Sequence, residues 1–182
     1  MQEIIQPIMD KVTKKAVQSN CKKILKKCSF KSSKDIGNIT ELVIWLYVYD
    51  YYDEAIKVCD MLKDIEFTGN YTLWDNIDHA LCVKARILRE RGKTAESAAI
   101  IKYINQYRAP HLYKNIKDWF LHTLDKNIEN SIRDNCKSGA KGWRLIKLEN
   151  AIAYREAGKF PVSDRKLEKI ISDMKDILKE EK

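Results

Sequence analysis

The residues best suited to catalysis lie in one short segment, where an aspartate, a histidine and a cysteine follow one another. Asp75 and His79 are four residues apart, and Cys82 follows His79 by three, so on a helix all three share one face. A carboxylate that hydrogen-bonds an imidazole orients it for acid–base chemistry. A simpler interpretation is that the Asp75–His79 pair only stabilises its helix. An unrecognised enzyme centred on this pair stays an alternative.

Metal and cofactor chemistry has little support in the sequence. His79 and Cys82 could share a metal ion, but a zinc site normally needs three or four protein ligands, and no second ligand pair stands at a usable spacing. The motifs GxSxG, HExxH, GxGxxG and the Walker loop are absent. We therefore expect no catalytic residues, no metal site, no cofactor and no enzymatic activity.

A second place where chemistry could occur is the lysine-rich N-terminal segment, residues 1–35. It carries nine lysines against three acidic residues, and so supplies most of the net charge of +8. Apolar residues recur every three or four positions from Ile5 to Cys28, which predicts one amphipathic helix with a basic face. That face has three interpretations, namely a solvated surface, a nucleic-acid contact, or a docking surface for an acidic partner or anionic lipid.

Composition limits the elements that must position these residues. The chain has 182 residues, 45% of them hydrophobic, with only six glycines and three prolines. So few turn residues argue against a β-sandwich or barrel, and the length suits one domain. Five cysteines without CxxC spacing favour reduced thiols in the cytoplasm. The longest strongly apolar stretch, residues 42–48, is too short to span a membrane, and no secretory signal is expected.

The hydrophobic periodicity predicts an all-α domain. After the N-terminal helix we expect further helices over residues 38–50, 53–63, 72–91, 94–107, 111–124, 126–136 and 142–157, and from 163 to the end. Asn38 and Thr72 are the expected caps of two of these helices. Gly92 and Gly158 are the expected stops of the helices over 72–91 and 142–157.

Self-comparison reveals an internal repeat. Residues 85–93 and 151–159 share Ala, Arg, Glu, Gly and Lys at five of nine positions, and both pieces are a helix end followed by another helix. Residues 43–62 form a third copy, in which Asp50 takes the place that Gly92 has in residues 85–93. Small residues at Ala55, Ala85 and Ala151 would let paired helices approach closely.

These copies resemble the tetratricopeptide (TPR) repeat, although their spacing is longer than in that family. The segment Tyr52-Asp53-Glu54-Ala55-Ile56 is similar to the start of the second helix of such a repeat. The resemblance implies a right-handed array of about eight helices in antiparallel hairpins. In one domain, 1–182, it places the Lys-rich helix at 1–35, two TPR-like hairpins at 38–107, and further helices with a third, degenerate hairpin at 110–182.

The resemblance also implies which side chains line a concave groove. Repeated groove arginines suit carboxylate recognition, because a guanidinium binds a carboxylate through two hydrogen bonds. Alternatively, each arginine pairs with a neighbouring glutamate such as Glu90 or Glu156. An aromatic cluster at 45–52, followed by Trp74, belongs either to the core or to this groove. The predicted partner-binding residues are Ile44, Tyr47, Trp74, His79, Arg86, Arg89 and Arg155.

The resulting functional expectation is a protein–protein interaction module. Its concrete version is a bacterial immunity protein that binds and neutralises a toxin domain, or a module that binds an acidic peptide. This hypothesis requires Tyr47, Arg86 and Arg89 to be exposed in one concavity. Nucleic-acid binding by the Lys-rich segment is the first alternative, and the Asp75–His79 enzyme is the second.

Overall fold

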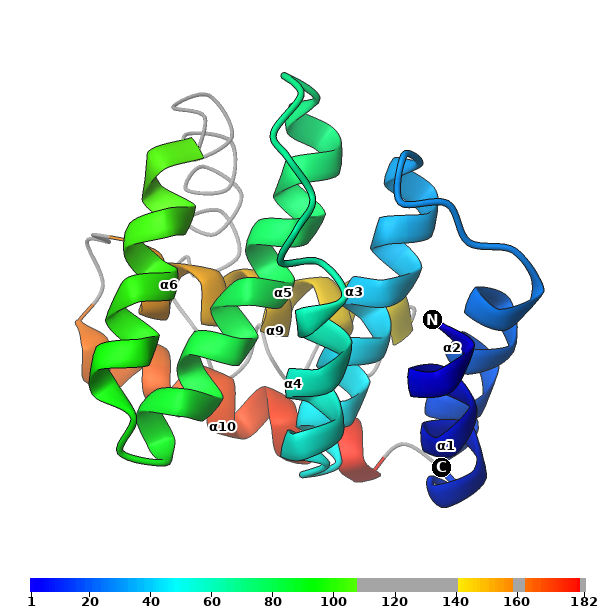
Figure 1. Cartoon of the computed structure of the whole chain (residues 1–182). Coiled ribbons are helices and arrows are strands. Elements are labelled where there is room, and N and C mark those ends of the chain that lie inside the picture. The colour runs from blue at the N-terminus through cyan, green and yellow to red at the C-terminus, as the bar shows by residue number, and fades with distance from the viewer. Residues whose placement is uncertain (108–140, 159–162, 181–182) are drawn as a thin grey trace.

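The computed structural model describes residues 1–107, 141–158 and 163–180, and within these ranges it is entirely helical (Figure 1). The all-α prediction is confirmed for this part of the chain, and the helices expected over 111–124 and 126–136 lie outside it. The described helices are α1 (Gln2–Lys11), α2 (Lys15–Lys26), α3 (Ser33–Val48), α4 (Tyr52–Asp60), α5 (Tyr71–Glu90), α6 (Thr94–Tyr107), α9 (Lys141–Ala157) and α10 (Asp164–Glu180).

The N-terminal segment is two helices, so the prediction of one continuous helix is wrong. Val12 leaves the helical conformation, with φ −98° and ψ 113°, and its side chain is fully buried. The side-chain amide of Gln18 donates to the carbonyl oxygen of Val12 at 2.8 Å, which satisfies a backbone acceptor freed by the break. Because the chain folds back there, α1 and α2 pack against each other and both bury their apolar faces.

The helix ends at Asp50 and Gly92 are equivalent, as the repeat predicted. Gly92 has φ +76°, its N–H donates to the Arg89 carbonyl at 3.0 Å, and the Lys93 N–H donates to Leu88 at 2.9 Å. At the end of α3, Asp50 has φ +63° and the same two hydrogen bonds form, from Asp50 to Tyr47 and from Tyr51 to Leu46. Both ends are Schellman motifs, but aspartate takes the left-handed position less readily than glycine.

Two helix starts differ from the sequence prediction. The cap of α3 is Ser32, whose hydroxyl accepts from the Asp35 N–H at 3.4 Å, so the helix begins five residues before Asn38. The cap of α5 is Asn70, whose side chain accepts from the Leu73 N–H at 3.1 Å. In each case a good capping residue stood upstream of the one that the apolar pattern indicated.

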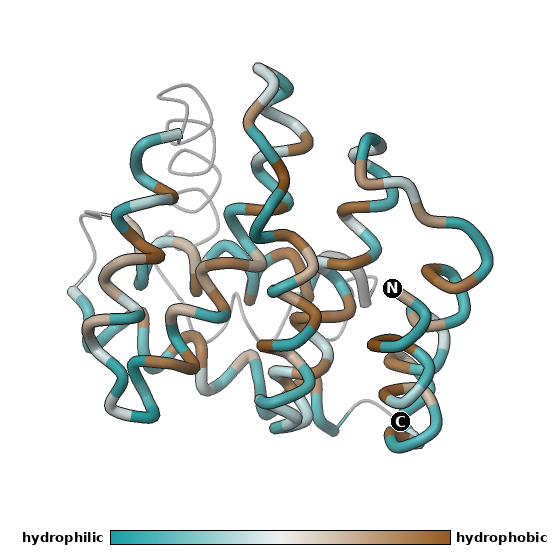
Figure 2. The backbone as a smooth tube through the Cα atoms, in the orientation of Figure 1, coloured by the Kyte–Doolittle hydropathy of each residue, from teal (hydrophilic) through white to brown (hydrophobic). Residues whose placement is uncertain are grey.

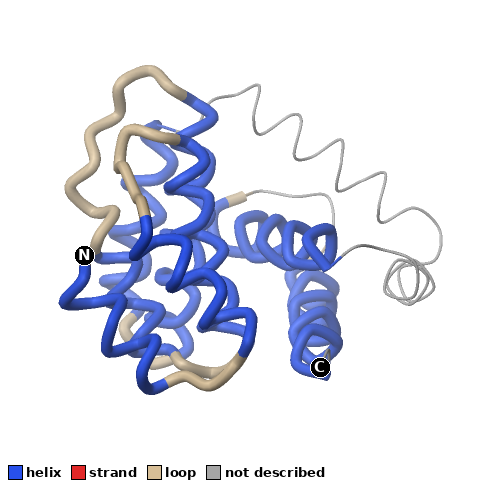
Figure 3. The backbone as a smooth tube through the Cα atoms, turned by 90° about the vertical axis from the view of Figure 1, so that its right-hand side faces the viewer, coloured by secondary structure: helices blue, strands red, loops and turns tan. Residues whose placement is uncertain are grey.

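Two groups of helices build the core. Helices α1 to α6 pack side by side, and α9 and α10 run across one face of this layer (Figures 1 and 3). Helix α9 packs mainly on α5, while α10 packs on α9 and reaches α3. Hydrophobic and hydrophilic residues interleave along the helices, as Figure 2 shows, so each contributes an apolar stripe to the shared core.

The small residues that the repeat indicated for helix packing lie inside the molecule. Ala55, Ala85 and Ala151 are all fully buried. Where α6 crosses α5, the hydroxyl of Ser97 donates to the Ala85 carbonyl at 2.7 Å. No helix among the described residues combines the length and the apolar character that a membrane span requires.

Candidate functional site

The residues predicted to line an open groove come together, but inside the molecule. Tyr47 is 2% exposed and Arg86 is 7% exposed, so the expectation that both would be accessible in a concavity is wrong. Ile44, Trp74 and His79 are buried as well. For Tyr47, Arg86 and His79 the reason is the position of the C-terminal helices, because α9 and α10 pack over α3 and α5 and contact these side chains. Sequence periodicity gave no sign of that covering layer.

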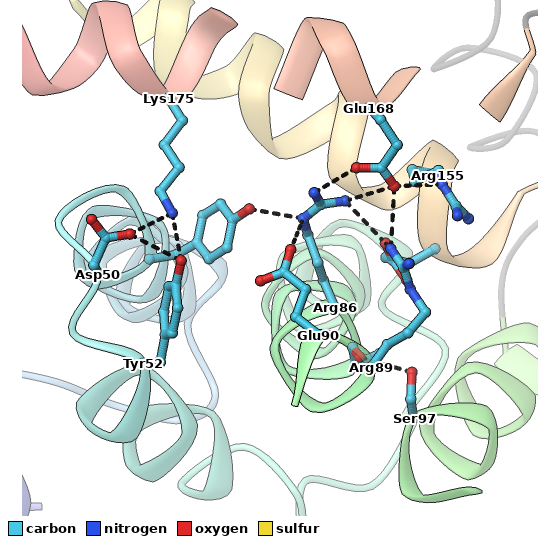
Figure 4. A network of polar contacts seen from close by, with 12 residues as sticks. Asp50, Tyr52, Arg86, Arg89, Glu90, Ser97, Arg155, Glu168 and Lys175 are labelled. Carbon is cyan, nitrogen blue, oxygen red and sulfur yellow. Dashed lines mark hydrogen bonds and ion pairs between the residues drawn. The ribbon is translucent and has the colours of Figure 1, made fainter. Parts of the chain in front are cut away.

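Arg86 on α5 is the centre of a polar network (Figure 4). Its Nε donates to the Tyr47 hydroxyl at 2.8 Å, and its Nη2 donates to Glu168 of α10 at 2.7 Å. Glu90 lies 2.9 Å from Nε and Glu156 of α9 lies 3.3 Å from Nη1. Burial lowers the pKa of Arg86, but the hydrogen bond to Glu168 and the surrounding negative charge raise it more, so the guanidinium stays charged.

The repeat-equivalent arginines Arg89 and Arg155 join the same network. Arg89 binds Glu156 with two hydrogen bonds, from Nε at 3.1 Å and from Nη2 at 2.6 Å. Arg155 on α9 donates from Nε to Glu168 at 2.7 Å. The predicted carboxylate recognition therefore occurs within the chain, because the two shared carboxylates come from α9 and α10. Both arginines are partly exposed, with side-chain accessibilities of 34% and 21%.

A second polar cluster fixes the other half of α10. The Asp50 carboxylate accepts from Lys175 at 2.6 Å, from Lys179, and from the Tyr52 hydroxyl at 2.9 Å. The Lys175 ammonium also lies 4.3 Å from the centre of the Tyr47 ring. Burial alone would raise the pKa of Asp50, but the hydrogen bonds from the two lysines and Tyr52 lower it to about 2. The left-handed aspartate thus supplies a contact that a glycine there could not make.

Asp75 and His79 form the expected i,i+4 pair on α5, but as an ion pair and not as a hydrogen bond. The His79 Nε2 lies 3.8 Å from Asp75, too far for a hydrogen bond, while Nδ1 lies 2.8 Å from Glu149 of α9. Burial alone lowers the pKa of His79, but the charges of Glu149 and Asp75 and the hydrogen bond to Glu149 outweigh it, raising the pKa to about 10. Such a histidine is protonated at neutral pH and cannot accept a proton as a general base.

Cys82 is turned to a different neighbour. Its thiol donates to Asp78 at 3.3 Å, and both residues are buried. Across the ranges 1–107, 141–158 and 163–180, no group of three His, Cys, Asp or Glu side chains could hold a metal ion. Through Glu149, His79 makes a buried contact between α5 and α9.

The aromatic residues mostly belong to the core. Trp45 and Tyr47 are each 2% exposed, and the Trp45 ring stacks on Tyr49 with 5.7 Å between centroids. Trp74 contacts Tyr103 and Tyr107 of α6 edge to face, at 5.8 and 5.2 Å. This geometry resolves the alternative left by the sequence in favour of core packing.

An open cationic surface lies elsewhere, on helices α2 and α3. A cleft of about 700 Å³ forms between the end of α2 and the start of α3, lined by Lys23, Lys26, Lys27, Ser29, Ser32, Lys34, Asp35 and Asn38. We define the lysine face as Lys22, Lys23, Lys26, Lys27 and Lys34, all of them exposed. Lys23 has a partner, Glu41 at 3.7 Å, whereas no ion pair holds the other four within the described residues. The sequence indicated these lysines but not the cleft, which depends on the early start of α3 at Ser33.

Comparison with known proteins places the chain in a family. The model of DUF6707, a family of unknown function, matches residues 1–180. The chain belongs to this family. No curated protein matches the sequence, and no solved structure matches it.

Proposed function

We propose that the protein is a non-enzymatic binding module whose lysine face docks onto an acidic surface of a partner protein. The observation that carries this proposal is the contrast in pairing. The arginines predicted to bind a partner are satisfied by glutamates of the same chain. Three of the four lysines that line the cleft, Lys26, Lys27 and Lys34, have no ion-pair partner in the described residues. Unpaired charge gathered at a cleft attracts a complementary partner and orients its approach.

An acidic protein fits the lysine face better than a nucleic acid does. No arginine precedes Arg86 in the chain, and Phe30 is the single aromatic residue among the first 44. Recognition of single-stranded nucleic acid relies on aromatic or guanidinium stacking with bases, and this surface offers neither. Only phosphate contacts would remain, and they carry no sequence information.

The architecture behind this face is, in our proposal, a divergent TPR-like array of antiparallel hairpins. The matched Schellman ends at Asp50 and Gly92 and the buried alanines at the crossings support it. Helices α9 and α10 would then occupy the side that such arrays leave open to a ligand. A narrower form of the proposal is an immunity protein for a toxin domain with an acidic surface. Free thiols at Cys21, Cys28, Cys59 and Cys82 fit a reducing cytoplasm.

Charge reversal tests the proposal directly. Lys22, Lys23, Lys26 and Lys27 would be changed to glutamate together, and binding of a fluorescent poly-glutamate chain would be followed by anisotropy at 50 and 300 mM salt. The matched control changes four exposed lysines elsewhere, namely Lys57, Lys63, Lys93 and Lys102. We expect the lysine-face variant to lose binding and the control to keep it, and wild-type binding to weaken steeply with salt.

The opposite pattern would refute the proposal. Equal loss in both variants would show that only net charge matters, and tighter binding of a single-stranded oligonucleotide than of poly-glutamate would favour the nucleic-acid alternative. An unaltered far-UV circular dichroism spectrum confirms that each variant is folded.

A further inference from the structure

The cleft of the lysine face has more positive charge than a single carboxylate would neutralise. Four of its lining residues are lysines, contributed by both helices, against one acidic residue, Asp35. The Asp35 carboxylate is already engaged, because it accepts the Ser29 N–H at 2.8 Å across the loop. Lys26, Lys27 and Lys34 make no ion pair within the described residues.

The lining of the cleft is rich in hydrogen-bond donors. Besides the ammonium groups, Ser29 and Ser32 bring hydroxyls to it. Helix α3 begins beside it at Ser33 with the positive end of its dipole, and α2 ends beside it at Lys26 with the negative end of its own, so the net positive field comes from the lysines. The cleft contains no aromatic or aliphatic side chain that would bind an apolar ligand.

A phosphoryl group matches this combination better than a carboxylate does. A phosphate monoester carries close to two negative charges at neutral pH and presents three acceptor oxygens, so it can engage several ammonium groups at once. A glutamate carries one charge and two oxygens. Lysine binds phosphate as a mobile point charge, which suits a cleft lined by flexible side chains from two helices.

We propose that the α2–α3 cleft is a phosphate-binding site that accepts a phosphorylated side chain of the partner protein. This inference rests on the proposed function, since it assigns the group that the lysine face recognises on its partner. The cleft is compact and local, and it is bounded by the ends of two helices, which suits one phosphorylated residue and its neighbours. A nucleic acid would instead track along many lysines outside the cleft, such as Lys15 and Lys31.

The test uses the full chain and three fluorescent peptides of otherwise neutral sequence, whose central residue is phosphoserine, glutamate or serine. Anisotropy at 50 mM salt gives each affinity. We expect the phosphoserine peptide to bind at least about tenfold more tightly than the glutamate peptide, because its charge is doubled. Inorganic phosphate should compete with it. A variant with Lys26, Lys27 and Lys34 changed to glutamine should lose about tenfold in affinity or more.

Matched controls make the outcome specific. Changing Lys57, Lys63 and Lys102 to glutamine removes the same charge elsewhere and should leave the phosphoserine peptide bound within about twofold of wild type. If the triple cleft variant misfolds, the single changes Lys27→Gln and Lys34→Gln, one from each side of the cleft, should each weaken binding severalfold while the urea midpoint stays constant.

Three results would overturn the inference. They are equal affinity for phosphoserine and glutamate peptides, equal loss in the control variant, and tighter binding of a 20-nucleotide single strand that also needs Lys15 and Lys31. Poly-glutamate separates this failure from that of the proposed function. If poly-glutamate still requires the lysine face but phosphate gives no advantage, only the phosphate site is refuted. If poly-glutamate binding is independent of that face, the proposed function fails too.

Discussion

The molecule has two cationic regions with opposite surroundings. Arg86 and Arg89 of α5 and Arg155 of α9 are held by Glu156 of α9 and Glu168 of α10. The lysine face lies on α2 and α3, reaches solvent, and is largely unpaired. The same type of charge therefore pairs within the fold in one place and stays exposed in the other.

Side-chain chemistry explains this division. A guanidinium is planar, can bind two carboxylates through separate N–H groups, and is less strongly hydrated than an ammonium, so it suits a buried network. Glu156, with 3% of its side chain exposed, is held by both Arg86 and Arg89. An exposed lysine keeps its hydration and its conformational freedom until a ligand arrives. Unsatisfied charge at the surface is therefore a better indication of binding than repeated charge in the sequence.

The largest effect of a substitution on stability is expected from one that breaks the arginine network. Changing Arg86 to methionine leaves buried Glu156 without one of its partners and should lower the free energy of unfolding by about 3–5 kcal/mol. Urea denaturation measures this change. The parallel variant with methionine at Lys26 and Lys27 should shift stability by no more than about 0.5 kcal/mol. Similar losses in both variants would remove the distinction between the two regions.

The next prediction concerns pH and the buried histidine. The folded pKa of His79 is raised to about 10, above its ordinary value of 6.5, so its contribution to stability is complete below pH 6.5 and is lost as the pH rises through about 10. Wild type should therefore lose about 5 kcal/mol over this interval relative to His79→Gln, which has no such proton. Urea midpoints between pH 6 and 10.5 measure the difference, and parallel curves would contradict it.

A smaller effect on stability should distinguish the paired lysines of α10 from the unpaired lysines of the lysine face. Asp50→Asn removes the charge opposite Lys175 and Lys179 while keeping a residue that tolerates φ +63°. We expect a loss of about 0.5–1 kcal/mol at 20 mM salt, shrinking toward zero at 1 M, because half-exposed ion pairs are screened. A loss that is the same at both salt concentrations would mean that the charge is not responsible.

The same aspartate predicts an acid transition. The pKa of Asp50 is lowered to about 2 from an ordinary 3.8, so its stabilising contribution is present above pH 3.8 and disappears as the pH falls through about 2. Asp50→Asn should make the free energy of unfolding less dependent on pH over this range. Acid unfolding followed by circular dichroism tests the difference, and identical profiles for the two proteins would contradict the assignment.

The smallest expected effect is a gain in stability. Replacing Lys26, Lys27 and Lys34 by glutamine removes mutual repulsion on the lysine face and should stabilise the protein by a few tenths of a kcal/mol at low salt. Urea midpoints at 20 and 300 mM salt measure it. A clear destabilisation would show that these lysines have structural partners and would weaken the case for the open cleft.

The sequence predicted much of the local structure. The equivalence of Asp50 and Gly92 was visible in the repeat and recurs as two identical Schellman ends. The alanines at the crossings are buried as expected. The break after Lys11 was missed because no proline or glycine marks it, and the start of α3 was placed late because Ser32 stands before a weakly apolar turn.

The candidate site was predicted only in part. The repeat placed Arg89 and Arg155 in equivalent positions, and the structure brings both to the carboxylate of Glu168. Their partners could not be read from the chain, because Glu168 lies 79 residues from Arg89. The alternative pairing with Glu156 was noted from sequence proximity to Arg155, yet in the structure Glu156 binds Arg89.

The sequence by itself determined the all-helical character, the helix ends at Asp50 and Gly92, and the concentration of positive charge in the first 35 residues, because periodicity, capping and composition are local properties. The tertiary structure alone decided which positive charges are used internally. That depends on where α9 and α10 lie, and packing between distant helices is set by the sum of many weak apolar contacts rather than by any short pattern. The covering helices closed the predicted groove and left the cleft between α2 and α3 open.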